Sequence, residues 1–125
     1  MPADARSVQA LRGATSVEDD TREVITDRVK ELLAAMVERN GFDHDDVISA
    51  WFTGTPDIHS MFPAEAARHF GWGDVPLLCA QELDVAGAPP GIVRVLVHLN
   101  TARTRAELHH VYLHRAKALR DDLPE

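Results

Sequence analysis

The segment 91–99 is the most apolar run of the chain, and it carries one arginine, Arg94, among β-branched residues. A run of this kind, opened here by Pro89 and Pro90, predicts a largely buried β-strand. An arginine keeps its charge, and burying that charge without a partner costs a large free energy. Arg94 therefore needs a negative partner, which is either a carboxylate of the protein or an anionic ligand.

A second arginine, Arg12, ends another short apolar segment, residues 8–12. Two arginines on strands suggest a pocket for a small molecule that carries carboxylates. Each arginine also has a structural alternative. Arg94 could form an internal ion pair with Glu82 or Asp84 of the preceding strand, and Arg12 could simply reach water.

The composition is that of an ordinary globular protein. The chain has 125 residues, of which 45% are hydrophobic and 26% charged, and its formal net charge is −7. We expect residues 1–125 to form one domain with a substantial core, with 1–6 and 121–125 flexible. The acidic balance, with no basic block to offset it, argues against a nucleic-acid partner.

The chain holds one cysteine, Cys79, which excludes an intrachain disulfide framework and a cysteine-based zinc site. No apolar run approaches the ~20 residues that a membrane span needs. Residues 1–6 lack the apolar core of a signal peptide. We therefore expect a cytoplasmic protein with no membrane partner.

The spacing of apolar and turn-forming residues predicts the element order β-α-β-α-β-β-(α)-β. The strands are expected at 7–12, 47–53, 76–82, 91–99 and 110–113, and the helices at 20–39 and 64–70, while 116–119 is ambiguous. This order predicts an α+β fold, a mixed β-sheet with helices packed on one side.

Other residues are weaker candidates for chemistry. Glu82 can pair with an arginine or accept a ligand hydroxyl. Cys79 is more often a small buried residue than a nucleophile, and no histidine stands near it in sequence. His110 and His114 have the spacing of a helical metal pair, but the segment is predicted to be a strand, so we expect no metal site. Tyr112 needs a partner for its hydroxyl if it is buried.

The sequence contains no phosphate-binding loop and no dinucleotide-binding fingerprint. It offers arginines, a glutamate, a tyrosine and a cysteine, but no convincing base, nucleophile or metal ligand. This inventory fits binding, or a reaction catalysed by positioning and electrostatics alone.

Short segments spread over nearly the whole chain from about residue 8 carry a further signal. They are LRGATSVE (11–18), TPDIH (55–59), FPA (62–64) with Arg68, GW (71–72), VP (75–76), CAQELDV (79–85), IVRV (92–95), HVYL (110–113) and LR (119–120). Each is weak alone. Their joint order and spacing resemble the monofunctional chorismate mutase family of the Bacillus AroH type.

The resemblance implies a ferredoxin-like fold of the chorismate mutase type. It implies a homotrimer whose sheets form a barrel-like core, with active sites at the subunit interfaces. It further implies that chorismate, a dianion, is converted to prephenate by an intramolecular Claisen rearrangement in phenylalanine and tyrosine biosynthesis. No cofactor is expected.

The resemblance also implies roles for particular residues. Arg94 would donate to the ether oxygen of the substrate and to a carboxylate. Glu82 would accept from the ring hydroxyl, with Cys79 beside it. Arg12 and Tyr112 would hold the side-chain carboxylate. Further substrate-binding residues would shape the walls or add positive charge near the mouth: Phe62, Ala64, Leu77, Leu78, Leu119, Arg68 and Arg120.

Two departures from the family pattern matter. Glu65 stands where a lysine often lies near the entrance, so we expect weaker capture of a dianion or a higher KM. Leu78 replaces a small hydroxyl residue before the cysteine, so one polar contact is expected to be missing. There is also a geometric tension, because Cys79 and Glu82 have opposite parity on a regular strand. Both can face one pocket only if the strand ends or bulges between them.

Two alternatives stay open from the sequence. One is a trimeric imine or enamine deaminase that binds a carboxylate through a strand arginine, although its motifs are not evident. The other is a non-catalytic, metabolite-binding regulator.

Overall fold

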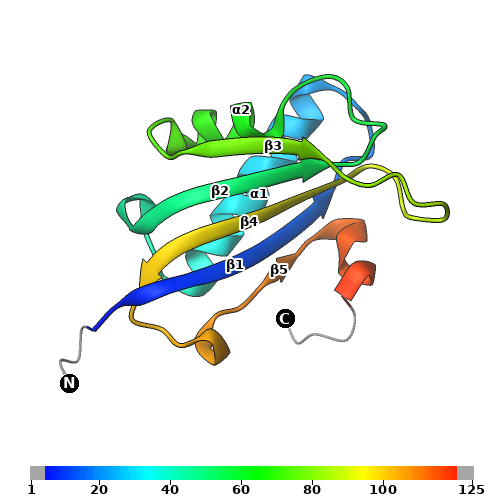
Figure 1. Cartoon of the computed structure of the whole chain (residues 1–125). Helices are drawn as coiled ribbons and strands as arrows, with labels where there is room; N and C mark the ends of the chain where they lie inside the picture. The colour runs from blue at the N-terminus through cyan, green and yellow to red at the C-terminus, as the bar shows by residue number, and fades with distance from the viewer. Residues whose placement is uncertain (1–4, 121–125) are drawn as a thin grey trace.

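The computed structural model describes residues 5–120, with all their side chains except that of Arg120 (Figure 1). The flexibility predicted for residues 1–4 and 121–125 lies outside the described residues. Arg6, also in the predicted flexible end, donates to the Asn100 carbonyl at 2.7 Å. None of the helices within the described residues is long and apolar enough to cross a membrane.

The centre of the molecule is a five-stranded mixed sheet in the order β3-β2-β4-β1-β5. The strands are β1 (Ser7–Ser16), β2 (Val47–Gly54), β3 (Leu77–Gln81), β4 (Ile92–Thr101) and β5 (Val111–Tyr112). β4 runs antiparallel to β1 and β2, whereas β3 is parallel to β2 and β5 is parallel to β1. The predicted α+β class with a mixed sheet is confirmed.

The long helix α1 (Arg22–Asn40) covers one face of this sheet, as Figure 1 shows behind β2 and β4. Thr21 caps its start by accepting from the Val24 N–H at 3.2 Å, and Gly41 ends it in the left-handed conformation with φ 61°. The predicted helix at 20–39 is therefore confirmed with small shifts at its ends. Its apolar stripe, Ile25, Val29, Leu32, Leu33 and Met36, is buried.

The short helix α2 (Pro63–Ala67) packs against α1 and continues into a π-helical turn, Arg68–Trp72. Pro63 starts it as expected, and Gly71, with φ 115°, breaks the helical conformation where the sequence predicted the stop. Both helices thus contribute to one apolar core with the sheet.

β1 is longer than predicted, because Gly13 to Ser16 pair with β4 down to Ile92. Gly13 lies so close to α1 that an added Cβ would stand 2.5 Å from the Met36 sulfur. The glycine therefore permits the close approach of strand and helix. The polar turn before β2 is a 3₁₀ helix, His44–Asp46. The ambiguous residues 116–119 lie in another, η4 (His114–Arg120).

β4 is largely buried, as predicted, but Arg94 itself is not. Val93, Val95 and Val97 are buried against the helices, but Arg94 is exposed and Leu96 is only half-buried on the opposite face. Residues of alternate parity face opposite sides of a sheet, and only one side is covered by helices here. We call the other side the open face. It exposes large apolar side chains, including Trp51 (47%) and Leu78 (54%).

Candidate active site

Arg94 lies on the open face, opposite Thr53 of β2 and Ala14 of β1. Its Nε donates to Oε2 of Glu82 at 3.0 Å, and the Thr53 hydroxyl donates to the same oxygen at 2.7 Å. The Arg94 side chain is 44% exposed and that of Glu82 16%. The ion pair with Glu82, one of the alternatives from the sequence, is therefore formed in this chain. The guanidinium of this pair lines a cavity.

This arginine cavity has a volume of about 380 Å³ and lies over the centre of the open face. Arg12 of β1, Arg94 of β4 and Tyr112 of β5 line it together. The remaining lining residues are Gly13, Ala14, Trp51, Thr53, Val95 and Leu96. The arginines predicted to share a pocket, about 80 residues apart in sequence, are thus brought together by the β1–β4 pairing.

Tyr112 forms one wall of the arginine cavity and is itself buried. It packs in a small cluster with Ala14 and Ile92 of the sheet and Ala116 of η4, and Leu119 lies against this cluster. The C-terminal 3₁₀ helix η4 therefore closes one end of the open face. Leu119 is placed near Tyr112, as a wall residue would need to be.

Cys79 lies on the opposite side of the sheet. Its partner in the β2–β3 register is the fully buried Phe52, and its Sγ accepts from the Ala64 N–H at 3.4 Å. Burial raises the pKa of the Cys79 thiol, and the Ala64 N–H and the charge of Arg68 offset this in part. The thiol therefore stays protonated near neutral pH, which disfavours a nucleophilic role.

A second cavity of about 410 Å³ includes Cys79 in its wall, and we call it the cysteine cavity. It is also lined by Phe62 and Pro63, by Glu65 of α2, by Arg22 of α1 and by His59. Phe62 is strongly exposed at this cavity, whereas Ala64 is buried and does not line it. Predicted wall residues are thus found here, away from the two strand arginines.

Within one chain, Cys79 and Glu82 do not share a cavity. β3 ends at Gln81, and the Glu82 N–H then donates to the Gly54 carbonyl at 3.0 Å while its side chain turns to Arg94. The strand therefore does end between them, as the parity argument allowed, but the two side chains still point to different cavities. Glu82 instead lines a smaller cavity of about 240 Å³ with Arg94 and the 83–90 loop.

The other predicted site residues are divided in the same way. Leu77 is half-buried on the helix side with Ala50 as its register partner, whereas Leu78 is exposed on the open face beside Trp51. Arg68 is exposed in the π-helical turn, close enough to act on the Cys79 thiol. The side chain of Arg120 lies outside the described residues.

Glu65 is not an isolated negative charge. It forms an ion pair with Arg22 of α1, and the His69 Nε2 lies 3.7 Å from the same carboxylate oxygen. The hydrogen bond from Arg22 holds the pKa of Glu65 below its usual range, so the carboxylate stays ionised. The partners are 43 residues apart in sequence. No local pattern could have indicated the pair.

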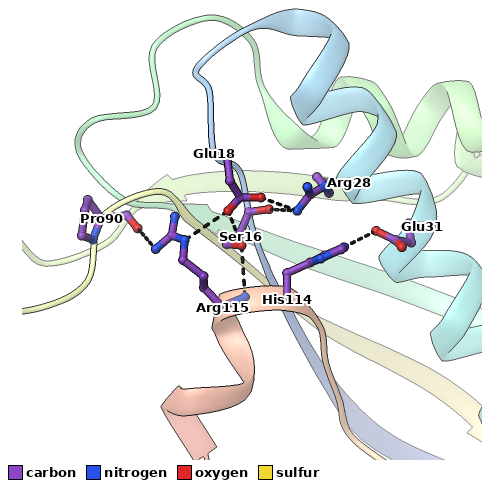
Figure 2. A network of polar contacts seen from close by, with 7 residues as sticks. All are labelled: Ser16, Glu18, Arg28, Glu31, Pro90, His114 and Arg115. Atoms are coloured by element: carbon purple, nitrogen blue, oxygen red, sulfur yellow. Dashed lines mark hydrogen bonds and ion pairs between the residues drawn. The ribbon is translucent and has the colours of Figure 1, made fainter.

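A polar network, drawn in Figure 2, fixes η4 to the end of β1. Glu18 accepts from the Ser16 hydroxyl at 2.7 Å and from Arg115 at 3.1 Å, and it pairs with Arg28 of α1 at 2.6 Å. These hydrogen bonds, that from Ser16 foremost, and the Arg28 charge lower the pKa of Glu18. Arg115 also donates to the Pro90 carbonyl at 3.3 Å.

A further contact of this network joins η4 to α1, because His114 Nε2 lies 2.8 Å from Oε1 of Glu31 (Figure 2). Four segments are thereby joined: the end of β1, α1, the loop before β4 and η4, which carries Leu119. The sequence did not predict these contacts. Within residues 5–120, no group of three or more His, Cys, Asp or Glu side chains is placed to hold a metal ion.

Comparison with known proteins identifies relatives along almost the entire chain. The family model "Chorismate mutase type I" matches residues 8–123. Chorismate mutase AroH of Bacillus subtilis (strain 168) is 40% identical over 117 residues, which are 93% of this chain and 92% of that protein. Chorismate mutase AroH of Thermus thermophilus is 45% identical over 117 residues, 93% and 96% of the two chains.

A solved structure, that of a chorismate mutase from Clostridium thermocellum, superposes with a TM-score of 0.86 at 44% identity. The matched region covers 88% of this chain and 98% of the Clostridium thermocellum chain. The resemblance found in the sequence is confirmed by these matches: the chain belongs to the type I chorismate mutase family.

Proposed function

We propose that this protein catalyses the rearrangement of chorismate to prephenate. The single observation that carries the proposal is the arginine cavity, where Arg94, held by Glu82, shares a wall with Arg12 and Tyr112. Membership of the family supports the same reaction. A site with two guanidinium groups and no activated nucleophile suits a dianion that reacts within itself.

The reaction needs no group transfer from the protein. In a concerted Claisen rearrangement, the C–O bond of the enolpyruvyl ether breaks while a new C–C bond forms to the ring. The enzyme has to hold the compact conformer and stabilise the negative charge that grows on the ether oxygen. Positioning and preorganised electrostatics supply both effects.

In this proposal, Arg94 donates to the ether oxygen and to a carboxylate, and it is the principal catalytic group. Glu82 has two tasks. Its Oε2 is engaged by Arg94 and Thr53, which holds the guanidinium in place before the substrate arrives. Its Oε1 remains to accept a hydrogen bond from the ring hydroxyl. Arg12 and Tyr112 hold the side-chain carboxylate.

We further propose a homotrimer in which the arginine cavity of one chain meets the cysteine cavity of its neighbour. Two observations support this assembly. The proposed site residues fall into two cavities of one chain, and the open face exposes apolar residues such as Trp51 and Leu78, as an unpaired interface does. Cys79, Phe62 and Ala64 would then reach the substrate from the neighbouring chain.

Two properties expected from the sequence belong to the same proposal. The chain acts as one chorismate mutase domain without a cofactor, and it works in the cytoplasm, where a single reduced cysteine is ordinary.

The reaction is tested by following the loss of chorismate absorbance with purified protein, and then converting prephenate to phenylpyruvate with acid. We expect turnover far above the uncatalysed rate. Absence of turnover would refute the proposal. Tight binding of a prephenate-like dianion without turnover would instead favour the metabolite-binding regulator.

The assembly is tested by light scattering, which should give a particle of three 13.8-kDa chains. A mixing experiment tests the shared site. Arg94→Ala damages the arginine cavity and Phe62→Glu the cysteine cavity, so each variant should lose most activity. Co-refolding the two should restore part of it, because some interfaces then combine two intact halves. No recovery would contradict a site built from two chains.

A further inference from the structure

We infer that Arg22 binds the ring carboxylate of the substrate, and that Glu65 is the residue that positions it. The inference rests on the proposed function, because it assigns a partner to the second carboxylate of the same dianion. Arg12 and Tyr112 account for the side-chain carboxylate. The ring carboxylate still needs a cation on the wall that the neighbouring chain contributes.

The lining of the cysteine cavity points to Arg22. Among the described residues that line this cavity, Arg22 is the one arginine. The other ionisable groups there are His59, Glu65 and Cys79, and the thiol is neutral because burial raises its pKa. An anion that enters this cavity therefore has one fixed positive charge to meet on these walls.

Arg22 is placed on a rigid element. It is the first residue of α1, directly after the Thr21 cap, and α1 is anchored by its buried stripe against the sheet. The N-terminal end of a helix carries a partial positive charge, which adds to the attraction for an anion. A guanidinium at this point is better positioned for binding than one on a surface loop.

The ion pair with Glu65 orients Arg22 through one nitrogen of the guanidinium. Glu65 is the more buried partner, with its side chain 25% exposed against 57% for Arg22. A guanidinium has five N–H donors. Among the described residues, its contact with Glu65 runs through Nη2. The other donors can bind a carboxylate while the pair stays intact.

The charges of the pair decide what its loss would do. Arg22 keeps the pKa of Glu65 low, so the glutamate is ionised throughout the physiological range. Removing Arg22 would delete the binding group and also leave an unpaired carboxylate facing an anionic substrate. This explains how the chain can carry Glu65 near the site, a residue that the sequence alone marked as unfavourable.

The test is steady-state kinetics with chorismate for four variants: Arg22→Ala, Arg22→Lys, Glu65→Ala and the double alanine variant. Arg22→Ala should raise KM about tenfold and change kcat by less than about threefold, since ground state and transition state carry the same ring carboxylate. Arg22→Lys should recover most of the KM. In the Glu65→Ala background, Arg22→Ala should still raise KM.

Arg39→Ala is the matched control, because it removes the same charge from the opposite, exposed end of α1. It should leave both constants unchanged. Thermal unfolding and particle size are measured for every variant, to separate binding from folding. An unchanged KM in Arg22→Ala would overturn the inference. The inference would also be overturned if Arg22→Ala raised KM in the unmodified protein but not in the Glu65→Ala background. In that case Arg22 would only screen the charge of Glu65. Failure of the proposed function would give a different result, because the unmodified protein itself would then not turn over chorismate.

Discussion

The two faces of the sheet are built from the same strands but serve different purposes. On the covered face, Val93, Val95 and Val97 meet the apolar stripe of α1 and are fully or almost fully buried. On the open face, the residues between them place a charged pair, Arg94 and Glu82, beside exposed apolar side chains. Residues that stabilise the fold and residues proposed for the chemistry therefore alternate along β4, so changes one residue apart should affect different properties.

The largest effect on stability is expected on the covered face. Leu32 of α1 is fully buried in the core, against Gly13 of β1. Leu32→Ala removes buried apolar surface and leaves a cavity, which should lower the free energy of unfolding by about 2–5 kcal/mol. Denaturant unfolding measures this loss. Below the unfolding transition, KM should be unchanged. A loss of less than about 1 kcal/mol would mean that this face is not the core.

On the open face, the same chemical reasoning predicts an effect on assembly. Leu78→Glu places a charge on an apolar, exposed position of β3. In a monomer this change should cost little, because the side chain already meets water. In the proposed trimer it would bury a charge, so light scattering should show dissociation, with loss of activity. Lys30→Glu, at a partly buried position of α1 on the other side of the sheet, is the charge control. An intact trimer in Leu78→Glu would place the interface elsewhere.

A smaller effect on stability is expected at η4, which the Glu18 network joins to β1 and α1. Glu18→Gln keeps the shape of the side chain but removes the charge that holds Arg28 and Arg115. These groups are partly exposed, so the free energy of unfolding should fall by about 1 kcal/mol. KM should rise more than kcat falls, because η4 carries Leu119 beside Tyr112. Equal KM in variant and unmodified protein would show that η4 does not depend on this network.

The smallest effect concerns pH and lies outside both faces. The hydrogen bond to Asp74 raises the pKa of His44, and the pKa of Asp74 is lowered in turn. The contribution of His44 is fully present below its unfolded pKa of about 6.5 and is lost as pH rises through the higher folded pKa. The contribution of Asp74 is present above its unfolded pKa of about 3.9 and is lost as pH falls through its lower folded pKa.

The free energy of unfolding should therefore decline slightly between pH 6 and pH 9, by an amount that His44→Gln removes. Denaturant unfolding at several pH values checks this. Since His44 is partly exposed and Asp74 mostly exposed, the slope should also weaken at high salt. Identical slopes in the variant and the unmodified protein would assign the pH dependence to other groups.

Local patterns in the sequence predicted most of the fold. The helix at 20–39 was found because its apolar spacing, its threonine cap and its terminal glycine all agree. β1 was predicted too short, since its second half owes its strand conformation to pairing with β4, about 80 residues away. Pairing partners of that kind leave no local signal.

The site was predicted in its residues but not in its arrangement. Arg94 and its partner Glu82 could be found because a charge in an apolar run demands a carboxylate. The burial of Arg94 was wrongly predicted, because Leu96, also on the open face, is as apolar as the core valines next to it. Sequence alone does not distinguish a face that meets helices from one that is open in a single chain. The pairs Arg22–Glu65 and Arg115–Glu18 join distant segments and were missed.

We propose Arg94, on the open face, as the principal catalytic group for the rearrangement of chorismate. The kcat for chorismate of Arg94→Ala is compared with that of Arg94→Lys and with that of Val97→Ala, a buried residue of β4 on the covered face that does not line the arginine cavity. Arg94→Ala should raise the barrier by about 3–4 kcal/mol, as loss of an oxyanion donor does, with little change in unfolding. Arg94→Lys should recover part of the rate, and Val97→Ala should lower stability with kcat nearly intact. Retained activity in Arg94→Ala would contradict the account.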